Sequence, residues 1–236
     1  MKYIAIFLLA FSLMTILPAM SQDAQYWLAQ TESDYNNGTY SLALDDIEEY
    51  LEINSSDPWA WNFKANLLIK MKRYSDAVDS FDQIIKLDSS NYQAYNDRAL
   101  ILSGRLKQDD EALDSLNMAL QINSNNANIW FNKGMILEKM ERYSEALEAY
   151  GQAATLDPSL DRAWYRQGHV LMLTESYEES LQSLEKATEL NPKNADAWND
   201  KRLVQMELSN VKDFQENTSM AASVQGTVPE RTIDFQ

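Results

Sequence analysis

The chain has 236 residues, with 36 acidic side chains, 20 basic side chains, one histidine and no cysteine. Without cysteine there is no disulfide framework, thiolate zinc site or cysteine nucleophile, and the single histidine, His169, excludes a multi-histidine metal site. A formal net charge of −16 argues against nucleic-acid binding, because Lys and Arg are needed to displace the counterions of a phosphate backbone. Six Gly, five Pro and 45% apolar residues describe an ordered, mainly helical chain.

The first 21 residues have the pattern of a secretory signal peptide. Lys2 precedes an uncharged run, residues 3–17, and the small residues Ala19 and Ser21 predict cleavage before Gln22. A retained anchor is the alternative, since about 17 apolar residues is at the lower limit for spanning a bilayer. We expect a secreted or extracytoplasmic protein, with membrane association only through an uncleaved N-terminal segment.

Export would make three N-x-[S/T] sequons available for glycosylation, with chance occurrence of the motif as the alternative. They lie at Asn37, Asn54 and Asn217.

Everything after residue 23 follows a period of 34 residues. An aromatic landmark recurs at spacings of 34, 34, 35, 34 and 34, at Trp27, Trp61, Tyr95, Trp130, Trp164 and Trp198. A small residue follows in each unit, at Ala43, Ala77, Ala112, Ala146 and Ser180. Self-similarity at a fixed period in this range indicates a repeat array.

Each unit carries two apolar stripes with helical spacing. In the second unit the first stripe contains Trp61, Ala65 and Leu68. The second stripe of that unit contains Ala77, Phe81 and Ile84. Two amphipathic helices are therefore predicted per unit, with small facing residues that allow them to approach closely. One pair alone cannot bury its apolar face, so stacked pairs must share a continuous core.

The units resemble tetratricopeptide repeats, whose pattern is W-x2-L-G-x2-Y, then A-x3-F, then P. The fourth unit matches at Trp130, Gly134, Leu137, Ala146 and Pro158. The Leu slot instead holds Lys64, Arg98, Lys133 or Gln167, in which the chain is similar to archaeal and other prokaryotic members. The resemblance implies an all-α, right-handed α-solenoid.

The register sets the expected boundaries. Five repeats are predicted over 24–57, 58–91, 92–126, 127–160 and 161–194, then a capping helix over 195–209 and a flexible tail over 210–236. The third repeat has one extra residue between Arg105 and Asp110, which we interpret as a loop insertion.

No catalytic, phosphate-binding or metal-binding motif is present in the sequence, so neither an enzyme nor a cofactor is expected. Asn- and Asp-rich turns such as 88–91 fall where the repeats need turns, and they lack the Gly and bidentate Glu of a calcium loop. His169 has no nucleophile beside it in the sequence, and we expect it to line a groove rather than to act in catalysis.

Binding in this family resembles a cradle in which first-helix side chains line a concave groove. Transfer of those positions gives a set of groove residues that includes Phe63, Gln93, Asp97, Met135 and Met172. The predicted peptide-binding residues within the set are Asn62, Asn66, Asn96, Asn128, Phe131, Asn132, Arg162, Tyr165, Arg166 and His169. Arg162 and Arg166, one helical turn apart, could grip a peptide carboxylate while Tyr165 and Phe131 pack the adjacent side chain. The alternative is that both arginines pair with Asp161 or with acidic neighbours.

Asn132, Arg162 and Arg166 also match two of the three parts of the carboxylate clamp found in chaperone-binding members. The sequence therefore predicts an exported, non-catalytic protein-interaction scaffold that binds a partner peptide or helix in its groove. The alternative is a structural or assembly component of the cell envelope that acts through its convex face or tail. The sequence does not predict the oligomeric state.

Overall fold

The computed structural model describes residues 23–225, with side chains placed up to residue 213 and at residue 215. Within this part of the chain every regular element is helical. The residues form two compact units, the first ending at Ser124 and the second beginning at Asn125.

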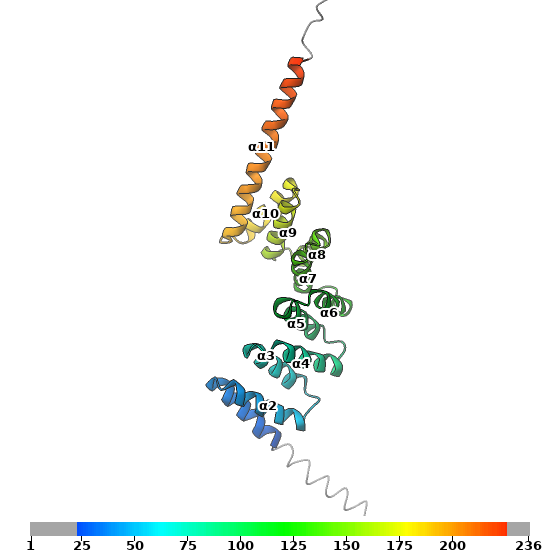
Figure 1. Cartoon of the computed structure of the whole chain (residues 1–236), viewed down its shortest axis with the longest axis vertical. Helices are drawn as coiled ribbons and strands as arrows, with labels where there is room; N and C mark the ends of the chain where they lie inside the picture. The colour runs from blue at the N-terminus through cyan, green and yellow to red at the C-terminus, as the bar shows by residue number, and fades with distance from the viewer. Residues whose placement is uncertain (1–22, 226–236) are drawn as a thin grey trace, which may run out of the picture. The chain divides into compact units, whose positions relative to one another are not determined.

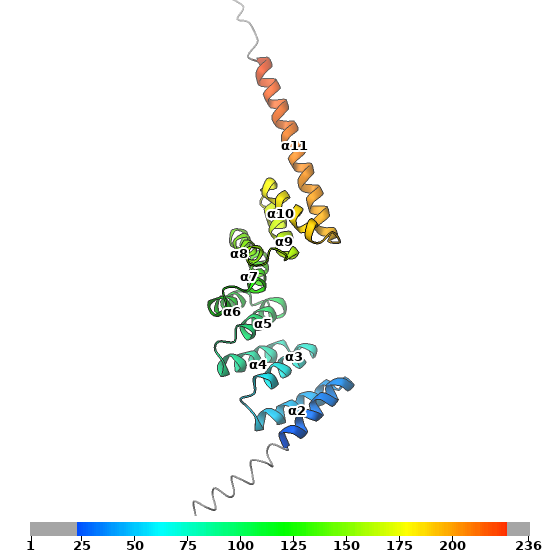
Figure 2. The same ribbon diagram turned by 180° about the vertical axis from the view of Figure 1, so that it is seen from behind.

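The first unit contains three helix pairs. The first pair is a helix over residues 23–37 and α2 (Tyr40–Ile53), and the second is α3 (Pro58–Lys70) and α4 (Tyr74–Leu87). The third pair is α5 (Tyr92–Ile101), which continues into the π-helical turn η1 (Leu102–Leu106), and α6 (Asp109–Ile122). Figure 1 and Figure 2 both show α3 and α4 side by side, and α5 packs on both α4 and α6.

The second unit contains two helix pairs and a final helix. The pairs are α7 (Ala127–Lys139) with α8 (Tyr143–Leu156) and α9 (Asp161–Leu173) with α10 (Tyr177–Leu190); α11 (Ala195–Gln225) packs on α10 and α9. The expected end of the capping helix at residue 209 is wrong, because α11 continues to Gln225. The physical reason is the absence of any Gly or Pro between 195 and 225, the two residues that most readily end a helix.

Each first helix ends at a residue in the left-handed conformation. In the second repeat the N–H of Arg73 donates to Leu68 O (2.8 Å) and that of Lys72 to Ile69 O (3.0 Å), the two hydrogen bonds of a Schellman turn. Only the first repeat has glycine at the left-handed position, so the other repeats accept an unfavourable backbone conformation there. The positions are Gly38, Lys72, Lys107, Glu141 and Glu175.

The extra residue of the third repeat lies in a widened helical turn, not in a loop as the sequence suggested. Residues Leu102–Leu106 form η1, and the N–H of Gln108 donates across six residues to Leu102 O at 3.0 Å. A π-type turn absorbs one residue without ending the helix. Leu102 therefore stays buried, and Lys107 still takes the left-handed conformation.

The repeated aromatic landmark ties each first helix to the loop before it. The indole N–H of Trp61 donates to Ser55 O at 2.8 Å, and those of Trp164 and Trp198 donate to Pro158 O and Pro192 O, each at 3.1 Å. In each case the acceptor carbonyl lies six residues before the tryptophan. The same local hydrogen bond therefore recurs in different repeats.

Cations at the Leu slot of the family pattern connect three neighbouring pairs of helices. Lys64, Arg98 and, at the matching position of α11, Lys201 each pair with a carboxylate 16 residues earlier, on the preceding second helix, whereas Lys133 has Asn117 at that distance. The pairs are Lys64–Glu48 (2.7 Å), Arg98–Asp82 (2.7 Å) and Lys201–Glu185 (3.6 Å). At partly exposed sites such pairs contribute about 0–1 kcal/mol each, so apolar packing remains the main source of stability.

Candidate functional site

In the second unit, Arg162 of α9 lies over the ring of Phe131 of α7. Its Cζ is 4.6 Å from the ring centroid, and its Nη2 donates a hydrogen bond to Asn128 Oδ1. The side chain of Arg162 is exposed, and the described residues give it no acidic partner. Arg162 thus presents a positive charge that two neutral groups hold in position.

Phe131 itself is 5% exposed, which corrects the expectation that its ring would pack a ligand side chain directly. The ring lies against Tyr150 of α8, with centroids 5.7 Å apart, and under the Arg162 guanidinium. The phenylalanine therefore packs between the two helices of its own repeat, and the exposed Arg162 guanidinium lies over its ring.

Arg166 pairs with an acidic residue, unlike Arg162. Its Nη1 is 3.2 Å from Glu138 Oε1 of α7, and Glu138 Oε2 accepts a hydrogen bond from the Tyr150 hydroxyl at 2.6 Å. Burial, and then the Glu138 carboxylate, raise the pKa of Tyr150, so the phenol stays protonated and continues to donate. The hypothesis that both arginines grip one peptide carboxylate must therefore be narrowed to Arg162.

Asp161, the alternative partner considered for both arginines, accepts a hydrogen bond from Asn191 Nδ2 at 2.7 Å. Its carboxylate therefore helps to join the start of α9 to the end of α10.

His169 and Tyr165 lie further along α9, toward α11. His169 Nδ1 is 2.8 Å from Asp200 Oδ2, and Asp200 is only 7% exposed. The rings of Tyr165 and His169 have centroids 6.0 Å apart, and burial followed by the charges of Asp200 and Asp196 raises the pKa of Tyr165. His169 therefore connects α9 to α11 on the predicted face of the repeats.

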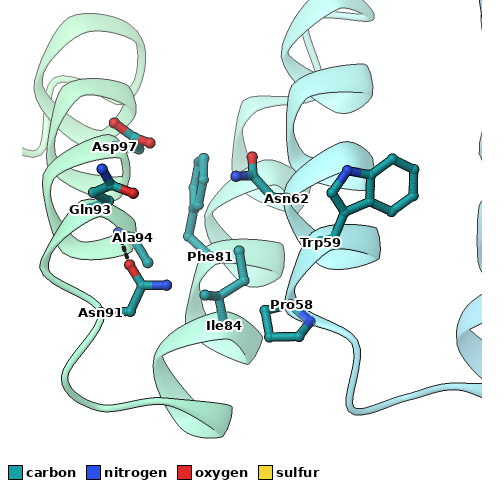
Figure 3. Close-up of a pocket in the computed structure, with 9 residues that line it drawn as sticks. All are labelled: Pro58, Trp59, Asn62, Phe81, Ile84, Asn91, Gln93, Ala94 and Asp97. Atoms are coloured by element: carbon teal, nitrogen blue, oxygen red, sulfur yellow. Dashed lines mark hydrogen bonds between the residues drawn. The ribbon is translucent and has the colours of Figure 1, made fainter.

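Among the predicted residues of the first unit, Asn62 lines a small pocket, whereas Asn66 and Asn96 contact residues that line it. Asn66 Nδ2 donates to Asn62 Oδ1 at 2.7 Å, and Asn96 Nδ2 donates to Asp97 Oδ1 at 2.9 Å. The pocket has a volume of about 190 Å³. Figure 3 shows Asn62 projecting from α3 and Gln93 and Asp97 from α5, on either side of Phe81.

Glu138 and Asp200 are site residues that the sequence prediction did not select, whereas Asp97 was among the transferred groove positions but not among the selected binding residues. Asp97 and Asp200 occupy the sixth position of their units, which the same transfer of groove positions covers, and Glu138 occupies the twelfth. The register was therefore a sufficient signal for all three, whereas their partners depend on side-chain geometry.

The remaining predicted sites have simple locations. Asn37 and Asn54 are exposed at the ends of their helices, Asn217 lies in α11, and Asn132 is partly buried on α7. The predicted signal segment lies outside the described residues. Among the described residues, no helix is long and apolar enough to cross a membrane, and no three His, Cys, Asp or Glu side chains could hold a metal ion.

Comparison with solved structures finds tetratricopeptide proteins. A crystal structure of MamA has a TM-score of 0.65 and 18% sequence identity, and the match covers 74% of this chain and 95% of MamA. MamA from Desulfovibrio magneticus RS-1 has a TM-score of 0.64 and 20% identity, and the match covers 73% of this chain and 97% of that one. YrrB, described as a TPR protein with an unusual peptide-binding site, has a TM-score of 0.62 and 24% sequence identity. The match covers 75% of this chain and 90% of YrrB. These likenesses concern the fold, and they confirm the all-α solenoid class.

Comparison with curated protein sequences finds no match. Three models of the tetratricopeptide repeat match residues 64–127, 127–160 and 161–194, which together form a continuous stretch longer than half of the chain. The chain therefore belongs to the tetratricopeptide repeat family.

Proposed function

We propose that this protein is an exported, non-catalytic scaffold that binds an extended partner peptide on the face formed by α7 and α9. A carboxylate of the peptide, from Asp, Glu or the C-terminus, pairs with Arg162. The peptide-binding description of YrrB supports this class of ligand by analogy of fold.

The observation that carries the proposal is the exposed, preorganised guanidinium of Arg162. Stacking on Phe131 and the hydrogen bond to Asn128 restrict its rotamers, so little entropy is lost when a carboxylate binds. The guanidinium fork can donate two parallel hydrogen bonds to one carboxylate. Arg166 is already neutralised by Glu138, so it stabilises the face without competing for the ligand.

A peptide library tests the proposal. Immobilised peptides with Asp or Glu fixed at one position, and matched peptides with Asn or Gln there, are probed with the full chain and with Arg162→Ala. We expect the variant to lose roughly tenfold or more in affinity for the acidic peptides, the typical effect of removing a hydrogen bond to a charged group.

Arg142→Ala is the matched control, because Arg142 is an exposed arginine of the same unit that already pairs with Glu145 at 2.7 Å. It should bind the acidic peptides like the unmodified chain. Equal losses in the two variants would show a general charge effect and refute a site at Arg162. Peptide binding through another surface would leave Arg162→Ala unchanged and would refute it as well.

Export is the second part of the proposal, supported by the pattern of residues 1–21. Mass spectrometry of the native protein should find Gln22 as the first residue. Recovery of the intact N-terminus would instead support a retained anchor.

A further inference from the structure

The pocket between α3 and α5 in the first unit has walls of two different kinds. Phe81 and Ile84 of α4 form its apolar floor, and Asn62, Gln93 and Asp97 place polar side chains around it (Figure 3). With a volume of about 190 Å³ it is smaller than the roughly 300–1,000 Å³ of sites that take whole small molecules. It is the right size for a single side chain.

Asp97 is the one ionisable residue that lines this pocket, and the fold does not neutralise it. Its carboxylate accepts a hydrogen bond from Asn96, and the described residues give it no basic partner. Burial raises the pKa of Asp97, and the hydrogen bond from Asn96 offsets only part of that effect. The ionised carboxylate is therefore costly to the fold, which is common where a group serves binding rather than stability.

The neighbouring acidic residues do not share this situation. Asp82, on α4, is paired with Arg98 at 2.7 Å, and Asp57 accepts hydrogen bonds from the N–H of Trp59 and the hydroxyl of Tyr50. These carboxylates have structural partners within the protein. Asp97 has a cavity beside it instead.

We propose that this pocket binds the basic side chain of a partner peptide, with the ammonium or guanidinium group on Asp97. The amide oxygens of Asn62 and Gln93 accept its remaining N–H groups, and its aliphatic stem packs on Phe81 and Ile84. A single carboxylate with neutral amides suits a monovalent organic cation. A metal ion would need more anionic ligands than the pocket provides.

The charge of the first unit favours the same ligand. Residues 23–124 contain 18 Asp and Glu against 8 Lys and Arg, a net charge of −10. Such a field attracts a basic peptide and raises its local concentration. The site is independent of Arg162, which lies in the other unit and binds the opposite charge.

The test uses N-acetyl-arginine amide as the probe, with N-acetyl-citrulline amide as its uncharged analogue. Both are titrated into the full ¹⁵N-labelled chain while the side-chain amide signals of Asn62 and Gln93 are followed by NMR. We expect the arginine probe to shift both signals in a saturable way and the citrulline probe to bind about tenfold more weakly or worse. Equal binding of the two probes would overturn the proposal.

Asp97→Asn should weaken the arginine probe by roughly tenfold to a hundredfold. Asp114→Asn, the same change at an exposed position on α6, should leave it unaffected. Equal weakening by the two variants would indicate only long-range attraction and would overturn the site. Arg162→Ala should bind the probe normally, so a failure here is distinguishable from a failure of the peptide site on α7 and α9.

Discussion

Two glycines of the second unit should respond oppositely to the same substitution. Gly134 of α7 faces α8, and a Cβ there would lie 2.5 Å and 2.6 Å from Cε1 and Cδ1 of Tyr150. That ring cannot easily move away, because it is fully buried, contacts Phe131 and donates to Glu138. A Cβ on Gly151 of α8 would meet only Gln167 Nε2, at 3.5 Å.

Replacing a helical glycine by alanine gains about 1 kcal/mol of helix propensity. At position 151 nothing opposes this, so Gly151→Ala should raise the free energy of unfolding by about 0.5–1 kcal/mol. At position 134 the overpacking costs about 1–3 kcal/mol, and displacement of Tyr150 puts its hydrogen bond to Glu138 at risk, worth about another 1 kcal/mol. Gly134→Ala should therefore lower the free energy of unfolding by about 1–3 kcal/mol net.

Urea unfolding followed by circular dichroism measures the free energy of unfolding of both variants. The repeats of such an array contribute separately to stability, so hydrogen exchange of the α7 and α8 amides shows whether the change is confined to the fourth repeat. Tyr150→Leu supplies a double-mutant cycle, since the third repeat has Ala99 and Leu116, both fully buried, at the positions that match 134 and 150. The added alanine should cost less in the Leu background. An unfolding midpoint for Gly134→Ala at or above that of the unmodified chain would refute the close contact between α7 and α8.

Three further outcomes are expected. Glu175→Gly removes the strain of a non-glycine residue in the left-handed conformation and should add about 1 kcal/mol to the free energy of unfolding. Glu178→Gly, within α10, should lower it by about as much. The urea unfolding midpoints of the two variants should therefore shift in opposite directions. Asp97→Asn should raise the melting temperature at pH 7, because burial raises the pKa of the carboxyl in the folded state and its ionised form costs stability. The advantage should disappear as the pH falls below 3.8, where Asp97 is protonated whether folded or unfolded, and a pH series of melting curves measures it. Tyr150→Phe removes the hydroxyl that donates a hydrogen bond to the partly buried Glu138 carboxylate. It should lower the free energy of unfolding by about 1–3 kcal/mol in the same urea assay. An unchanged value would mean that water replaces the hydroxyl.

Local patterns in the sequence predicted most of the helices. The spacing of Trp61, Ala65 and Leu68 needs only helical periodicity to indicate a buried face, and Ala65 and Leu68 are fully buried. The small residues Gly134 and Ala146 were expected to bring two helices close together, which the contact between Gly134 and Tyr150 confirms.

Other features depended on information that the pattern lacks. The single extra residue of the third repeat could be accommodated in a loop or in a helix. The sequence alone does not show which of the two arrangements forms the better backbone hydrogen bonds. The full length of α11 was missed because its later residues lack a regular apolar stripe, although no helix breaker interrupts them.

The candidate site was predicted by position but not by pairing. Arg162 and Arg166 both occupy groove positions, yet one of them is neutralised by Glu138 and the other lies over Phe131. That difference depends on rotamers of residues 28 and 31 positions apart, which one sequence does not determine.

The ion pairs separated by 16 residues flank the second repeat on both sides. Deletion of exactly residues 58–91 would bring the third repeat's Arg98 to the place of Lys64, opposite Glu48 of the first repeat. A cation would again face a carboxylate at the new junction. Loss or duplication of this repeat can thus keep its junctions charge-matched without any compensating mutation, and this change in length is open to evolution through a single coding segment.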